Sequence, residues 1–213
     1  MDDRLIWLWL SLHFGAGSTI YEKLYKHFGS AYSIYDSDDG DMECIDWLTS
    51  SQKKKILDKN LDHAREISEW CDDNEVRIIA FSDEDYPSPL KSLVNFPAVL
   101  YCKGSFLPDF ENDLCIAVVG TRKMTVYGQK NAYEIGFGLA KAGVTVVSGM
   151  ALGIDCTAQK GALYAGGKTI AVLGSGIDVI YPKANTVLMQ KILYNGAVIT
   201  EYPPSTPPNA TNF

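Results

Sequence analysis

Between residues 115 and 200, continuous apolar runs alternate with segments that have the periodicity of helices. The apolar runs are the predicted strands, at 115–119, 144–147, 169–173 and 197–200. The segments between them are the predicted helices, at 125–142, 154–164 and 184–194. Because the apolar runs lack polar alternation, we expect parallel strands that are covered on both faces. The pattern therefore predicts an α/β fold with a mostly parallel, doubly wound sheet.

The first part of the chain has helical spacing instead. Helices are predicted at 4–14, 19–28, 42–49 and 52–73. Thr19 and Glu22 have the spacing of a capping box, and the acid-rich stretch 36–41 is interpreted as a solvated loop. Two further strands are predicted at 76–81 and 98–102. We therefore expect an all-helical domain over residues 1–73 and an α/β domain over residues 74–213.

The apolar stretch Leu5–Leu10 is too short to span a membrane, and it follows two aspartates rather than a basic segment. We interpret it as part of a core helix. The chain has five cysteines, an odd number, and no C-x-x-C pair. This usage indicates reduced thiols and predicts a cytoplasmic protein.

The formal net charge of −7 argues at first against a phosphate-rich ligand, but it hides an uneven distribution. Residues 1–115 contain 22 acidic and 11 basic residues, whereas residues 116–213 contain 4 acidic and 8 basic ones. The same second segment holds 13 of the 18 glycines. A basic, glycine-rich segment therefore coincides with the predicted α/β sheet.

Ligands of such sheets bind at the carboxyl ends of the strands, where small and polar residues occur here. Glycines let an anion approach the backbone, and helix N-termini supply amide groups. Arg122, the only arginine in residues 116–213, follows the first of these strands, and Ser148 and Ser175 are interpreted as hydroxyl donors. The candidate phosphate-binding residues are Gly120, Thr121, Arg122, Lys123, Ser148, Gly149, Gly153, Gly174, Ser175, Gly176 and Lys183. For Asp155 and Asp178, a capping role is favoured over ligand contact.

The sequence contains none of the common catalytic or cofactor-binding motifs considered for an α/β domain. The chain has no G-x-G-x-x-G fingerprint, no P-loop and no G-x-S-x-G elbow. All three histidines, His13, His27 and His63, precede the α/β segment. We therefore expect a binding protein rather than an enzyme, without cofactor or metal.

Four motifs in this order resemble the Smf/DprA family of DNA-processing proteins. They are Ala117–Lys123, Val146–Asp155, Thr169–Pro182 and Thr200–Pro204. Asp85–Pro87 and Pro97–Tyr101 resemble the lead-in of the same family, so the resemblance covers residues 4–213.

The resemblance implies a helical domain of the sterile-alpha-motif or helix-hairpin-helix kind, followed by an extended Rossmann-like domain. It implies binding of single-stranded DNA, formation of a homodimer, and loading of the RecA recombinase during natural transformation. By position, the family's DNA-contacting residues fall on Arg122, Lys183, Asn212 and Phe213. Phosphates are then expected at the two basic residues and a stacked base at Phe213.

The chain departs from the family pattern at three places. Leu152 replaces a basic residue, and Gln159 replaces a histidine, which we expect to remove positive charge near the site. The sequence also stops at Phe213, before an arginine-rich run of the family. We therefore expect a C-terminally incomplete sheet with an exposed edge, a weakened dimer, and weak, salt-sensitive DNA binding.

Two other functions are considered besides single-stranded DNA binding. The first is a nucleotide-processing phosphoribohydrolase with a similar sheet, although the motif that supplies the catalytic glutamate of those enzymes is absent and Glu201 stands in a different context. The second is a module whose helical part only contacts protein. The acidic charge of residues 1–115 favours protein contact for that part.

Overall fold

The computed structural model describes residues 2–105 and 113–212. The chain divides into two compact units, Met1–Leu100 and Tyr101–Phe213. Each unit is described by itself below.

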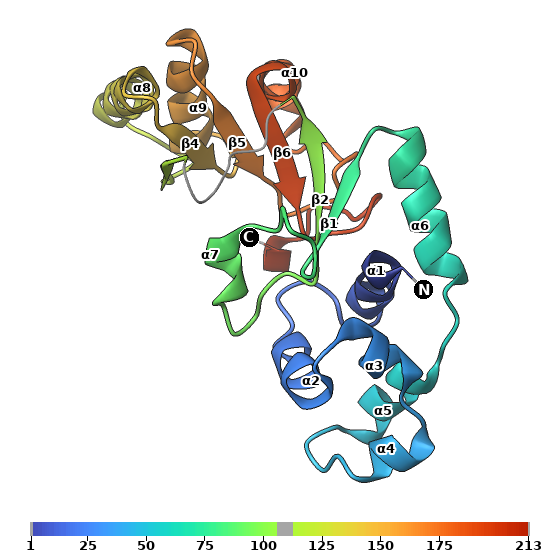
Figure 1. Cartoon of the computed structure of the whole chain (residues 1–213). Coiled ribbons are helices and arrows are strands. Elements are labelled where there is room, and N and C mark those ends of the chain that lie inside the picture. The colour runs from blue at the N-terminus through green and yellow to red at the C-terminus, as the bar shows by residue number, and fades with distance from the viewer. Residues whose placement is uncertain (1, 106–112, 213) are drawn as a thin grey trace. The chain divides into compact units, whose positions relative to one another are not determined.

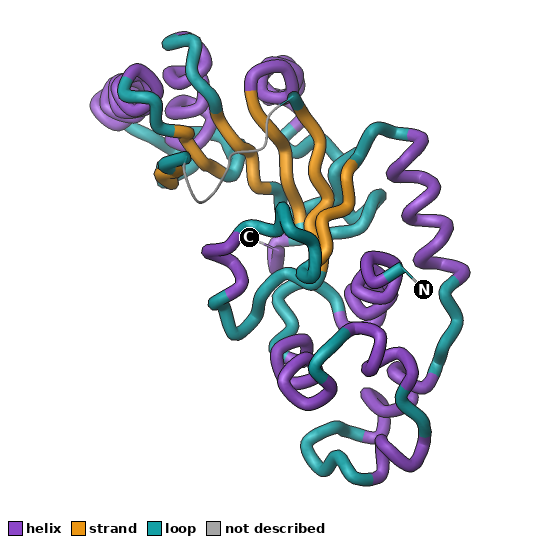
Figure 2. Tube along the Cα trace, in the orientation of Figure 1, coloured by secondary structure: helices purple, strands orange, loops and turns teal. Residues whose placement is uncertain are grey.

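The first unit is mainly helical (Figures 1 and 2). Its helices are α1 (Asp3–Phe14), α2 (Ile20–Phe28), α3 (Ala31–Asp36), α4 (Asp39–Glu43), α5 (Ser50–Leu57), α6 (Asp62–Asp73) and α7 (Ser88–Lys91). The predicted core role of the apolar N-terminal stretch is confirmed, because Ile6, Trp7, Leu8, Trp9 and Leu10 of α1 are all buried. No helix of the described residues is both long and apolar enough to cross a bilayer.

Two local predictions about this unit are wrong. Thr19 makes no side-chain cap at α2, where the hydroxyl of Ser18 accepts a 3.4 Å hydrogen bond from the amide of Ile20 instead. The acid-rich stretch is not only a loop, because Asp38 and Asp41 form a capping box that starts α4. Acidic side chains that cap amide groups at a helix start are stabilised there by the helix dipole.

The helical unit extends beyond residue 73 because the next segment contributes aromatic residues to its core. Strand β1 (Arg77–Ala80) and the start of β2 (Val99–Gly104) belong to this segment. The rings of Phe81 and Phe96 stack with centroids 3.9 Å apart, and Trp7 of α1 packs edge-on to Phe81 at 5.3 Å. The division between compact units therefore falls after Leu100, well past the predicted boundary at residue 73.

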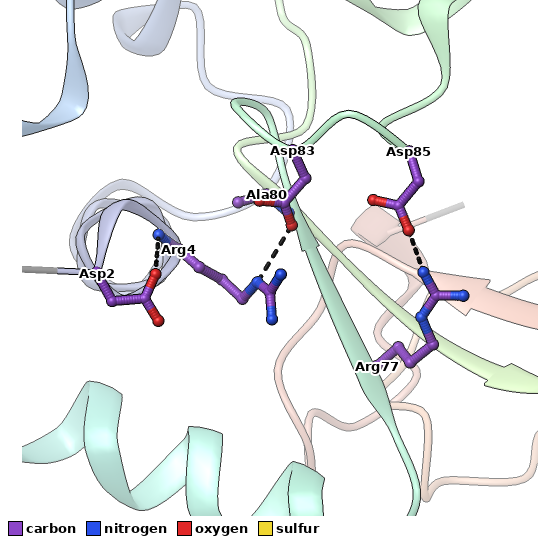
Figure 3. A network of polar contacts seen from close by, with 6 residues as sticks. All are labelled: Asp2, Arg4, Arg77, Ala80, Asp83 and Asp85. Carbon is purple, nitrogen blue, oxygen red and sulfur yellow. Dashed lines mark hydrogen bonds and ion pairs between the residues drawn. The ribbon is translucent and has the colours of Figure 1, made fainter.

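Polar contacts also join α1 to the end of β1 (Figure 3). The guanidinium of Arg4 donates a 3.1 Å hydrogen bond to the carboxylate of Asp83, which also accepts a 3.0 Å hydrogen bond from the amide of Ala80. Asp2 caps the same helix by accepting from the amide of Arg4. Arg77 and Asp85 form a further ion pair beside this network. These contacts fix the direction in which the chain leaves β1.

The second unit confirms the mixed α/β class (Figures 1 and 2). Its strands are the rest of β2, then β3 (Cys115–Ala117), β4 (Thr145–Ser148), β5 (Thr169–Val172) and β6 (Gly196–Thr200). The full strand order is β1-β2-β6-β5-β4-β3. Strands β3 to β6 are mutually parallel, with Val146 opposite Ile116 in the β3–β4 pair, and β2 runs antiparallel to β6.

Three helices connect the parallel strands: α8 (Val126–Lys141), α9 (Ile154–Tyr164) and α10 (Thr186–Asn195). Since the strand order advances in one direction, right-handed crossovers place all three helices on the same face of the sheet. α9 contacts both α8 and α10, as this arrangement requires. Among the described residues of this unit, helices therefore cover one face of the sheet and not both.

Candidate functional site

The carboxyl ends of β3, β4 and β5 lie at one edge of the sheet, because these strands are parallel and neighbouring. The loops that follow them form a small pocket of about 110 Å³. Its lining residues come from three loops and are Arg122, Gly149, Ala151, Leu152, Tyr181 and Pro182. The structure thus brings together two residues predicted from separate motifs, Arg122 and Gly149. Tyr181, which was not among the candidate residues, also lines this pocket, and its side chain is half-exposed.

Asp155, at the start of α9, holds the first two loops together. Its carboxylate accepts hydrogen bonds from the amide of Gly120 at 3.1 Å and from the amide of Gly149 at 3.2 Å. The side chain is buried, so these two bonds offset the cost of removing the carboxylate from water. Both amides are therefore engaged within the protein in this conformation, and phosphate binding at Gly120 and Gly149 stays a prediction. The favoured non-ligand role of Asp155 agrees with this geometry.

Gly153 sets the position of Arg122. Its backbone has φ of +90°, a left-handed value that favours glycine. A Cβ at this position would collide with the carbonyl oxygen of Thr121 and approach the backbone of Arg122. The amide of Ile154 also donates a 3.2 Å hydrogen bond to the Thr121 carbonyl. The start of α9 therefore fixes the loop that carries the arginine.

The two predicted hydroxyl donors are used inside the protein. Ser148 donates a 2.6 Å hydrogen bond to the carbonyl of Val118, and Ser175 donates a 3.0 Å hydrogen bond to the carbonyl of Val179. Both serines are buried. In this conformation they stabilise loop geometry rather than face a ligand, so their predicted role as phosphate donors is not supported by their orientation.

The loop after β5, which contains Gly174, Ser175 and Gly176, is held by the C-terminal segment. Asn212 donates a 3.0 Å hydrogen bond to the carbonyl of Gly174, and the amide of Gly176 donates to the carbonyl of Thr206. Asn212, predicted from the family pattern, therefore does lie against a predicted glycine loop. Phe213 lies outside the described residues.

Asp178 and Tyr202 belong to the segments that follow β5 and β6. Asp178 accepts hydrogen bonds from the amide of Ser205 at 2.7 Å and from its hydroxyl at 3.2 Å, which is the expected turn-stabilising role. Burial, and then the charge of Glu201, raise the pKa of Tyr202 above its ordinary value. The phenol of Tyr202 is protonated at neutral pH even at its ordinary pKa, and the raised pKa makes it still less acidic.

The remaining predicted residues are exposed. Thr121 organises a short turn by accepting a 3.2 Å hydrogen bond from the amide of Lys123. Lys123 follows Arg122 on the same exposed loop, and Lys183 follows the pocket residue Pro182. Asn185, just after Lys183, is buried and donates a 2.8 Å hydrogen bond to the carbonyl of Met150. The second and third loops are thereby linked, a contact that neither motif alone could reveal.

The two residue replacements among the departures from the family pattern have different consequences. Leu152 is 46% exposed and lines the pocket beside Arg122, so a basic residue at this position would add charge there. Gln159 is fully buried, and its amide donates a 3.0 Å hydrogen bond to the carbonyl of Ile170. The expectation that Gln159 removes positive charge from the site is therefore wrong, because its side chain faces the sheet.

Comparison with known proteins decides the family. Residues 77–213 match the sequence model of the family described as DNA recombination-mediator protein A. The chain belongs to this family. Protein Smf of Synechocystis is 32% identical over 217 residues, covering 100% of this chain and 54% of its own length. A DNA processing protein DprA of Mycobacterium tuberculosis is 34% identical over 191 residues, covering 82% of this chain and 49% of the relative.

Solved structures of DprA proteins share the fold. The DprA structure from Streptococcus pneumoniae matches with a TM-score of 0.79 and 27% identity, over 100% of this chain and 71% of that one. The DprA structure from Helicobacter pylori matches with a TM-score of 0.57 and 32% identity, over 65% and 61% of the two chains. The resemblance to the Smf/DprA family is thus confirmed. The chain spans about half the length of the curated relatives that it matches.

Proposed function

We propose that the chain binds single-stranded DNA at the strand-end loops and serves as a DprA-type recombination mediator. The observation that carries the proposal is the position of Arg122, which the start of α9 fixes at the rim of a pocket beside Gly149 and Tyr181. An arginine in such a place binds a phosphate through two parallel hydrogen bonds. The relative from Helicobacter pylori has been described for its single-stranded DNA binding mode, which supports this ligand.

The surroundings of Arg122 fit a nucleic-acid strand better than a whole nucleotide. The pocket of about 110 Å³ is smaller than the cavities of roughly 300–1,000 Å³ that enclose small ligands. Lys123 and Lys183 are exposed and follow the pocket residues Arg122 and Pro182 in the sequence, so phosphates of a bound strand can meet them. Tyr181 is 41% exposed and offers a ring on which a base can stack.

Catalysis forms no part of this proposal. The two carboxylates closest in sequence to the pocket residues are both engaged: Asp155 binds two loop amides, and Asp178 binds Ser205. Neither is placed to act as a general base or nucleophile in this conformation. A phosphoribohydrolase would instead release free base from nucleoside monophosphates, and we expect none.

Fluorescence anisotropy with labelled oligo-dT tests the binding. We expect Arg122→Ala to weaken affinity by about tenfold or more at low salt, because a hydrogen bond to a charged group contributes about 1.5–3 kcal/mol. For two or three phosphate contacts, the logarithm of affinity should fall with the logarithm of salt concentration with a slope of roughly −2. Arg65→Ala, the same change on the exposed surface of α6, serves as the matched control. Equal affinities of Arg122→Ala and the unaltered chain would contradict the proposal.

The finer activities follow from family membership and concern the whole, longer proteins. The chain, as part of a cytoplasmic protein, loads RecA onto incoming single-stranded DNA in natural transformation and forms a homodimer. Its helical unit contacts protein. We expect the chain to shorten the lag of RecA filament growth on single-stranded DNA, measured by the ATP hydrolysis that the filament performs. An unchanged lag, with DNA binding intact, would restrict this chain to DNA binding.

A further inference from the structure

A second, larger groove lies on the helical face of the second unit and is lined by residues of α8, α9 and α10. Figure 1 shows where these three helices lie. Its volume is about 680 Å³. Lys160 and Tyr164 line it from the last turns of α9, and Lys191 and Tyr194 line it from the last turns of α10. Each of these helices runs from a strand's carboxyl end back to the start of the next strand. The groove therefore extends toward the opposite end of the sheet from Arg122.

The groove presents aromatic rings to solvent. Tyr164 is 78% exposed and Tyr194 is 80% exposed. Tyr133 of α8 lies deeper, with its ring centroid 6.1 Å from that of Tyr164. Rings this exposed contribute little to the stability of the unit, because they bury little apolar surface. They are instead available to stack on a flat partner.

The charge of the groove is positive. Lys160 and Lys191 are exposed on neighbouring helices, and no acidic residue of the described chain lines the groove. The acidic residue of α9 is Asp155, which is buried and bound to the loop amides, and α10 has none. Neither lysine forms an ion pair within the part of the chain that the structure describes. Both ammonium groups therefore remain available to an anionic ligand.

We propose that this groove binds a second segment of single-stranded nucleic acid, with bases stacked on Tyr164 and Tyr194 and phosphates beside Lys160 and Lys191. Exposed rings beside cations are the combination that holds single strands without regard to sequence. The ligand class rests on the proposed function, whereas the site is separate from the Arg122 pocket. Since α9 spans about 16 Å at 1.5 Å per residue, only a longer strand reaches both places.

Oligonucleotide length separates the two sites. With oligo-dT of roughly 20 nucleotides, we expect the pair Tyr164→Ala and Tyr194→Ala to bind at least about tenfold more weakly than the unaltered chain. With oligo-dT of roughly 2 nucleotides, which is too short to cover the ~16 Å along α9 and occupies the Arg122 pocket alone, we expect no change. The pair Tyr164→Phe and Tyr194→Phe keeps the rings and should keep the affinity. Because both side chains are exposed, these variants should remain folded, which circular dichroism checks.

The lysines give an independent readout. The pair Lys160→Gln and Lys191→Gln should make the salt slope for the long oligonucleotide shallower by roughly 1.4, at about 0.7 per lost phosphate contact. Lys130→Gln with Lys141→Gln, on α8 outside the groove, is the matched control and should bind as the unaltered chain does.

Three results would overturn this inference while leaving the proposed function intact. The first is that the Tyr164→Ala and Tyr194→Ala pair binds the long oligonucleotide with unchanged affinity. The second is that this pair loses as much affinity for the short oligonucleotide as for the long one. The third is that this pair loses RecA binding while its DNA binding is unaltered. If the unaltered chain binds neither oligonucleotide, the proposed function itself fails.

Discussion

At the scale of single residues, the site depends on side chains whose roles the sequence motifs describe only in part. Gly120 and Gly149 were predicted to take part in phosphate binding, and Asp155 was expected to have a capping role. In the structure, the carboxylate of Asp155 accepts hydrogen bonds from the amides of Gly120 and Gly149. In the proposed complex, exposed side chains such as that of Arg122 are therefore the groups that contact phosphate. Leu152 lines the same pocket as that arginine, so a charge introduced at this position acts close to it.

We expect Leu152→Lys to strengthen binding of oligo-dT by roughly two- to fivefold at low salt, because it adds a cation at the rim of the pocket. The salt slope should become steeper by about 0.7. Leu152→Gln, which is polar but uncharged, is the control and should leave the slope unchanged. Anisotropy at two salt concentrations measures both quantities. A steeper slope for the glutamine variant would exclude charge as the cause.

At the scale of elements, β3 differs most from the sequence expectation. Its apolar run predicted a strand covered on both faces, yet the side chain of Ile116 is exposed. β3 also lies at the side of the sheet, because β4 is its only neighbour among the described strands. The same pattern correctly predicted β4, β5 and β6 as strands of the parallel sheet, and each has a neighbouring strand on both sides. Among the described residues, helices cover only one of their two faces. The pattern of apolar residues predicts that a segment is an extended strand. It does not predict which helix or strand packs against that segment. Among the described strands, β3 is an edge strand of the sheet.

An exposed apolar edge favours self-association, because unpaired strand groups and apolar side chains are both available. We expect sedimentation velocity to show association that increases with protein concentration, and Ile116→Lys to shift the chain toward monomer. Val94→Lys, at an exposed apolar position of the first unit, is the control. A monomer at all concentrations would contradict the homodimer proposed for this chain.

At the scale of the whole molecule, the sequence was sufficient for the family, the α/β class and the positions of most elements. Helix α9, for example, has the predicted bounds Ile154–Tyr164. The boundary between the compact units was not predictable from periodicity, because it depends on Trp7 packing against Phe81, two residues 74 positions apart. Neither was the groove at Tyr164 and Tyr194, since no motif contains both tyrosines. Contacts between distant segments leave no local pattern.

The contact of Asp155 with two loop amides also bears on the kinetics of binding. Loops that are ordered before a ligand arrives lose little conformational entropy when it binds, so no slow rearrangement needs to precede the complex. Association should then be limited by encounter, which cations such as Lys123 and Lys183 accelerate. Added salt would accordingly act mainly by slowing the arrival of the strand, and the lifetime of the bound complex would change less.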